Sequence, residues 1–347
     1  MSYFRDVEQW SLLAALRFVL ASIVAINHLP DFVAIGVLDI VPRFGAFEAI
    51  LGFLLISGYS IGASYQKQPN GFLMRRVMRV YPIYLVSLAL ACIVYAMDHG
   101  SLPSASVLLV NTLLLNQLIS ASSFVGPAWS LSLEFWLYCL TPLLFKLKDT
   151  TINRLVWLSF VSYLIYTCGR TLFHWVYFSG VAYGLNLLLL SYAWLVGLRM
   201  ARNASDTKPV LRQIGVIFLG HIALAISIQF ASAWTNNRVS FFFQHDLIGF
   251  ALQACTLALL FCIFWQIKHP QISHSEQVRP VAWLRTLGDI SYPLYLVHIS
   301  VYALLQRTAL QSPGLYYLIA VAVSYLIYKV VDRYSQRRHQ RFAIQPQ

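Results

Sequence analysis

Acidic side chains are scarce in this sequence, which contains only 13 aspartate and glutamate residues among 347. Charged residues of either sign make up 11% of the chain, whereas 59% of the residues are hydrophobic and the mean hydropathy is +0.64. Soluble domains typically carry about 25% charged residues. The shortage of charge therefore excludes an ordinary soluble domain and indicates an integral membrane protein.

Cysteine is also rare, and none of the five cysteines has the spacing of a metal site or of a disulfide framework. All five fall within or at the ends of apolar stretches, where free cysteine behaves as a small apolar residue. We therefore expect no metal and no disulfide scaffold. Because no repeat or low-complexity linker divides the chain, we also expect one membrane-embedded domain over residues 1–347, with a basic cytoplasmic tail at 332–347.

Apolar runs of about 20 residues, the length that crosses the hydrocarbon of a bilayer, recur along the chain. They cover residues 11–30, 44–65, 77–97, 126–145, 153–168, 181–198, 213–234, 247–266, 287–306 and 314–331. We therefore predict an all-α integral membrane protein with about ten transmembrane helices. A shorter apolar stretch at 106–119 contains Asn111, Asn116 and Gln117, which favours a re-entrant or interfacial helix; an eleventh span is the alternative.

The distribution of basic residues decides between these two topologies. With ten spans and a cytoplasmic N-terminus, only Arg43, Arg170, Arg238 and Arg307 fall in segments outside the cytoplasm, as the positive-inside rule requires. An eleventh span at 106–119 would reverse every later segment and place most cations outside. We therefore predict that both termini are cytoplasmic. Orientation and contact with anionic lipid explain the net charge of +12, so no nucleic-acid partner is expected.

Two ionisable residues, Arg17 and His28, lie within the first apolar run. An ionisable group in the hydrocarbon is costly and indicates a functional site by default. Their separation of eleven residues is close to three helical turns, which places both side chains on nearly one face and roughly 16 Å apart along the axis. The first helix is thus expected to carry a cation near its inner end and an imidazole near its outer end.

Two further motifs flank the second span. Arg75, Arg76 and Arg79 lie where the chain re-enters the membrane from the cytoplasmic side, and guanidinium groups suit the phosphates of a polyphosphate ligand. An ordinary positive-inside anchor is the alternative interpretation of this cluster. Ser57 and Gly58, near the end of the second span, form a small pair that permits close approach of another helix.

Polar groups also open the fourth and ninth spans. Glu134 lies one to two turns below the outer surface, where its carboxylate could hydrogen-bond the imidazole of His28; an ion pair with an intramembrane arginine is the alternative. The segment 287–298 contains Tyr292 and ends at His298, which by itself is typical of a core histidine. The same structural interpretation applies to His221.

Taken in order along the chain, these motifs resemble the acyltransferase 3 family of integral membrane enzymes. The motifs that carry the resemblance are Arg17 with His28, the pair Ser57–Gly58, the cluster Arg75, Arg76 and Arg79, and the segments 129–134 and 287–298. The resemblance covers nearly the whole chain. The family usually has a second phenylalanine where this chain has Leu54, a conservative difference. The chain resembles members that lack a fused esterase-like domain.

The resemblance implies transfer of an acyl group, usually acetyl, from cytoplasmic acyl-coenzyme A to a carbohydrate hydroxyl outside the cytoplasm. The expected location is the inner, or plasma, membrane, and the expected acceptors are O-antigen, lipopolysaccharide, another surface polysaccharide or a lipid-linked glycan. Acetyl-coenzyme A is the expected donor, with no metal. Residues expected to bind it are Arg75, Arg76, Arg79, Ser57, Tyr292 and His298.

His28, held by Glu134 or Asp31, is expected to act as general base on the acceptor hydroxyl. Arg17 is expected to stabilise the pantetheine path or the developing oxyanion. In a two-step variant His28 itself carries the acyl group, and the sequence does not separate the two routes.

A different class of function uses the same buried charges. In a secondary transporter or exporter of a glycan or small glycoside, they would form a proton relay. The sequence shows no two-fold internal repeat, which argues against a transporter. A structural scaffold would leave the buried charges unexplained.

Overall fold

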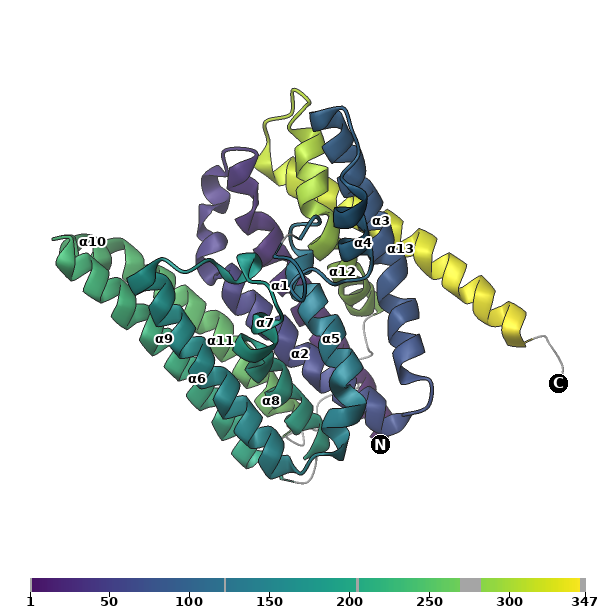
Figure 1. Ribbon diagram of the computed structural model, residues 1–347, viewed down its shortest axis with the longest axis horizontal. Helices are drawn as coiled ribbons and strands as arrows, with labels where there is room; N and C mark the ends of the chain where they lie inside the picture. Colours follow the sequence, from purple (N-terminus) through teal and green to yellow (C-terminus); the bar gives the residue numbers. More distant parts are fainter. Residues whose placement is uncertain (1, 122, 204–205, 269–281, 344–347) are drawn as a thin grey trace.

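The computed structural model describes residues 2–121, 123–203, 206–268 and 282–343 (Figure 1). These residues form an all-α membrane protein and contain no β-strand beyond an isolated bridge between Asn116 and Ser120. Within the described part, eight helices are long and apolar enough to cross a membrane. Helices are the expected solution for a single chain in lipid, because every backbone N–H and C=O group is then paired within its own segment.

The long helices match nine of the ten predicted spans to within a few residues at most ends. They are α1 (Ser2–Asn27), α2 (Ala46–Lys67), α3 (Phe72–His99), α5 (Ala128–Lys146), α6 (Asp149–Phe173), α9 (Lys208–Thr235), α11 (Leu247–Lys268), α12 (Ala282–Leu305) and α13 (Pro313–Ala343). Helix α13 therefore continues into the segment predicted as a basic tail, of which residues 344–347 lie outside the described part. The shorter helices are α4 (Ala105–Thr112), α7 (Leu185–Leu189), α8 (Ser191–Arg202) and α10 (Val239–Phe241), with a π-helical turn at Phe242–Asp246.

The predicted span at 181–198 is wrong as a single helix. The chain there turns through Tyr183 and Gly184, both with positive φ, and forms α7 and then α8, which has only 12 residues. Eleven of those residues, from Ser191 to Ala201, are buried. Protein surrounds this helix on all sides, and its buried Arg199 is paired with Asp149 at 2.7 Å.

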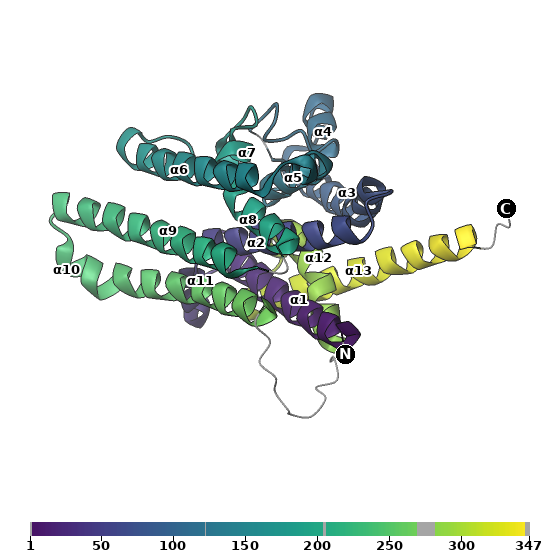
Figure 2. The same ribbon diagram turned by 90° about the horizontal axis from the view of Figure 1, so that it is seen from below.

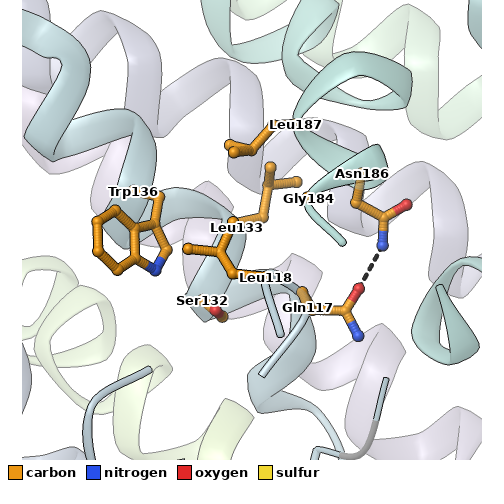
Figure 3. Close-up of a pocket in the computed structure, with 8 residues that line it drawn as sticks. All are labelled: Gln117, Leu118, Ser132, Leu133, Trp136, Gly184, Asn186 and Leu187. Atoms are coloured by element: carbon orange, nitrogen blue, oxygen red, sulfur yellow. Dashed lines mark hydrogen bonds between the residues drawn. The ribbon is translucent and has the colours of Figure 1, made fainter. Parts of the chain in front are cut away.

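As the sequence predicted, the stretch at 106–119 does not form a membrane-spanning helix. Helix α4 has eight residues, and the irregular chain after it is enclosed by protein, with Asn111, Asn116 and Gln117 all buried. The Gln117 amide donates to the Ser179 carbonyl at 2.9 Å, and the Asn186 amide donates to the Gln117 side chain (Figure 3). The hollow drawn in Figure 3 holds only about 10 Å³, too little for a substrate. Irregular backbone is tolerated at membrane depth only where protein satisfies it in this way.

Successive long segments run in alternating directions, so the connections gather at two ends of the bundle (Figure 1). We call one of them the basic end: it holds the start of α1, the connections at 67–72 and 146–149 and the start of α9, with Lys67, Lys146 and Lys208 among them. His28 lies at the opposite end, where α1 finishes. Seen from below, α2 and α8 occupy the middle of the molecule (Figure 2).

Helices α2 and α8 cross with their backbones in contact, as the pair Ser57–Gly58 predicted. A Cβ atom at Gly58 would lie 1.9 Å from the Trp194 carbonyl oxygen, and one at Gly197 would lie 2.2 Å from the Leu55 carbonyl oxygen. Side chains larger than hydrogen therefore do not fit at this crossing.

Candidate active site

Helix α1 fixes Arg17 near its middle and His28 at its end. The backbone N–H of His28 donates to the Ala25 carbonyl at 3.3 Å, and Pro30 lies in the 3₁₀ turn Leu29–Asp31 that follows. Proline is tolerated in a first helical turn but interrupts a longer helix, so the chain leaves the helical path just after the imidazole. His28 is thereby held at the end of the bundle opposite the basic end.

His28 contacts a second histidine, His298 of α12. The two rings are stacked, with centroids 5.1 Å apart and an interplanar angle of 25°. Nδ1 of His28 lies 3.0 Å from Nε2 of His298, and Nδ1 of His298 lies 3.0 Å from the Leu294 carbonyl oxygen. His298 is fully buried, and the ring of Tyr302 packs edge-on against it at 5.7 Å.

This chain of contacts assigns the protons of both neutral rings. A carbonyl oxygen only accepts, so Nδ1 of His298 carries a proton and donates it to Leu294. Nε2 of a neutral His298 is then an acceptor, and Nδ1 of His28 donates to it. The remaining nitrogen, Nε2 of His28, therefore has a free lone pair and is available as a base or nucleophile.

The predicted hydrogen bond between His28 and Glu134 is absent from the described residues, whereas Asp31 lies close enough to His28 to interact with it electrostatically. The Glu134 carboxylate accepts hydrogen bonds from Ser57 at 2.9 Å and from Tyr138 at 2.5 Å. Asp31 is exposed and makes no hydrogen bond to His28 among the described residues. Glu134 is out of reach because it lies well inside α5, level with Arg17, which is among its electrostatic neighbours.

Three arginines gather near the middle and the basic half of the molecule. Arg17 of α1 and Arg76 and Arg79 of α3 are electrostatic neighbours of one another, and Asp289 of α12 lies near Arg79. None of the three arginines forms an ion pair with a carboxylate in the described part of the chain. With Glu134 and Asp289 as the nearby acids, the cluster keeps a surplus of positive charge, which favours an anion.

The other predicted binding residues have structural contacts of their own. Arg75 donates to the carbonyl oxygens of Asn70, at 2.5 Å, and Gln68, and so closes the connection between α2 and α3. Tyr292 donates to the Val80 carbonyl at 3.1 Å and joins α12 to α3. Arg76 lies over the Phe72 ring at 5.6 Å, with its Nε unpaired.

Sequence reasoning missed two parts of this site. Tyr138, which donates to Glu134 from one turn further along α5, could have been found from its spacing of four residues. The pairing of His28 with His298 joins residues 270 positions apart and leaves no local signal. Each histidine was therefore predicted, but in a separate role.

Comparison with known proteins gives a consistent result. A family model for an acyltransferase domain matches residues 11–329 of the chain. ORF330 of Acidianus two-tailed virus, which carries an acetyltransferase name, is 23% identical over 256 residues, or 71% of this chain and 68% of its own. Acyltransferase MdmB of Streptomyces mycarofaciens is 25% identical over 267 residues, or 73% of this chain and 67% of its own. No solved structure matches the chain significantly.

Proposed function

Since this chain belongs to the acyltransferase family whose model spans residues 11–329, we propose that it moves an acyl group through the membrane from acyl-coenzyme A to a carbohydrate hydroxyl. The acyl group is acetyl in the simplest case. The donor binds from the basic end, which we place in the cytoplasm on the positive-inside rule. The acceptor reaches the opposite end, and the membrane is the inner membrane of the cell.

The observation that carries this proposal is the free lone pair on Nε2 of His28. The hydrogen bond to His298 fixes the tautomer of His28, as a carboxylate does in a catalytic triad. When His28 becomes protonated at Nε2, its Nδ1–H still donates to Nε2 of His298. Because His298 is itself held by the Leu294 carbonyl, its Nε2 is fixed, and the ring of His28 cannot turn without breaking the contact with it. A positioned imidazole of this kind contributes roughly 10²- to 10⁴-fold as a general base.

In the direct route, the acceptor hydroxyl attacks the thioester in a single transfer step. The acceptor hydroxyl gives its proton to Nε2 of His28 while its oxygen attacks the thioester carbonyl carbon. The carbon–sulfur bond breaks, the new ester remains on the sugar, and the coenzyme A thiolate takes the proton from the imidazolium. The same lone pair serves the two-step route, in which Nε2 attacks the thioester and passes the acyl group on.

The arginine cluster supports coenzyme A as the donor. Its surplus positive charge lies on the basic side of His28, and Arg17 and His28 are roughly 16 Å apart on one helix. A phosphate-bearing head bound by Arg76 and Arg79 would place the pantetheine arm along α1, with the thioester directed toward His28. Arg17 lies between the two and would stabilise the oxyanion or the arm.

Mass spectrometry of envelope glycans tests the function as a whole. Cells that express the chain are expected to carry sugars with an added O-acetyl mass, and cells with an empty vector are not. The glycan that gains the mass identifies the acceptor. Absence of any gain, combined with solute flux that consumes no thioester in vesicles holding the purified protein, would contradict acyl transfer and support a transporter.

Neutralising Arg76 and Arg79 together, as Arg76→Met and Arg79→Met, is expected to weaken acetyl-coenzyme A binding by at least about tenfold. Each charged hydrogen bond to phosphate contributes about 1.5–3 kcal/mol. Binding of S-acetylpantetheine, which lacks the phosphates, should change little. Labelled-ligand binding in detergent measures both. Arg154→Met is the matched control, because Arg154 is exposed at the basic end of α6. Equal loss for both ligands would assign the cluster a structural role.

A further inference from the structure

A cavity of about 450 Å³ adjoins the end of α1, where its lining includes Asn27, the residue before His28. It is lined by the end of α1 at Asn27, the start of α2, the last turns of α6, and parts of α9 and α11. Sites for small ligands have volumes of about 300–1,000 Å³. The cavity is therefore large enough for one or two sugar rings, and the residues discussed above for acyl transfer include none of its polar groups.

A chain of buried polar groups forms one wall of this cavity. His221 of α9 contacts Glu48 of α2 through Nε2 at 2.9 Å and Tyr163 of α6 through Nδ1 at 2.7 Å. The side chains of Glu48 and His221 are each only 6% exposed. Buried ionisable groups at membrane depth are costly and mark functional sites by default, so this wall needs an explanation beyond packing.

Arg170 and Gln253, which also line the cavity, have polar atoms without a hydrogen bond to another described residue. Nε of Arg170 is buried without a hydrogen bond, and its guanidinium instead lies over the rings of Tyr177, at 4.6 Å, and Phe178, at 5.3 Å. Gln253 of α11 makes no hydrogen bond to another described residue. Burial raises the pKa of Tyr177 to about 12, so its hydroxyl stays a donor at neutral pH. The cavity thus offers donors from several directions.

Besides these polar groups, the cavity has an apolar part that is formed by aromatic rings. Phe47 is stacked on Phe178 at 5.1 Å and on Tyr163 at 5.9 Å, and Tyr163 and Phe178 are themselves 5.8 Å apart at 24°. Tyr163 and Phe178 are buried by this stack, so Phe47 is the partly exposed ring of the three. The hydroxyl groups of a sugar also need hydrogen-bonding side chains, which Arg170 and Gln253 supply in this cavity.

We propose that this cavity is the acceptor subsite and that it binds a neutral, hydroxyl-rich sugar ring. The role as acceptor site rests on the proposed function, whereas the binding itself does not. The charges favour a neutral ligand, because Glu48 and Arg170 offset one another within the cavity. Asn27 precedes His28 in the chain, so a ring held in the cavity lies beside the end of α1 that carries the catalytic imidazole.

Saturation-transfer NMR on the purified protein tests this inference with the methyl glycosides of glucose, galactose, mannose and rhamnose as probes, in a detergent without a sugar headgroup. At least one glycoside is expected to give a saturable signal with the wild-type protein. Arg170→Met and Gln253→Leu should each lower the affinity of the protein for that glycoside about tenfold. This is the expected effect of losing one hydrogen bond to a charged or buried donor. Gln253→Leu guards against misfolding, since the amide makes no hydrogen bond to a described residue.

Arg238→Met is the matched control, because it removes an arginine that is exposed at the same end of the molecule and lies outside the cavity. The inference is overturned if no probe gives a saturable signal, if both cavity variants bind like the control, or if only methyl glucuronoside, the anionic counterpart, binds. Acetyl-coenzyme A binding is measured on the same samples. Its absence would count against the proposed function alone and would leave the sugar result standing.

Discussion

His28→Ala is expected to abolish acyl transfer while leaving acetyl-coenzyme A binding unchanged. The variant removes the only lone pair that the pair of histidines leaves free, at Nε2 of His28, whereas the arginine cluster lies about three turns away. A loss of roughly 10²- to 10⁴-fold in rate is the usual effect of removing a general base. The assay is transfer of labelled acetyl groups from acetyl-coenzyme A to the glycan in proteoliposomes, with donor binding measured in parallel.

His298 is a positioning residue in this mechanism, and its variant separates that role from a purely structural one. His298→Ala is expected to lower kcat with little change in the KM for donor, because it frees the ring of His28 without touching the arginine cluster. His245→Ala is the control, since His245 is exposed at the same end of the molecule. Retention of transfer by His28→Ala would refute the assignment. Acetyl found on His28 after brief incubation with donor alone would select the two-step route.

Gly58→Val is expected to prevent stable folding. Its side chain would meet the Trp194 carbonyl oxygen, which is backbone and has no flexible end to move aside. Overpacking costs about 1–3 kcal/mol where side chains can adjust and more where they cannot. The measurements are the yield of monodisperse protein in detergent and its midpoint of thermal unfolding. The same loss is expected for Gly197→Val, on the facing helix.

Gly249→Val is the matched control for this crossing, because a Cβ atom at Gly249 meets nothing within 4 Å. If Gly58→Val were as stable as Gly249→Val, α2 and α8 could not be in backbone contact. The crossing also bears on the site, since Ser57, next to Gly58, donates to the Glu134 carboxylate. Partly folded variants should therefore lose the order of the polar groups around Arg17 before they lose helix content.

The sequence by itself determined the class of protein, the positions of its long apolar helices within the described residues, and the placing of Arg17 and His28 along the first of them. These features depend on hydropathy and on the 3.6-residue period, which are local properties of the chain. The sequence also predicted the close approach at Gly58, because small residues in an apolar helix allow the backbone of another helix to come close.

Only the tertiary structure decided which polar groups meet. Lipid and protein interior are both apolar, so the segment 181–198 has the composition of a span although protein surrounds α8. His28 contacts His298 rather than Glu134, and His221 contacts Glu48 across 173 positions, because these partners are set by how helices pack. Spacing along one helix carries no information about the side chain that a different helix brings beside it.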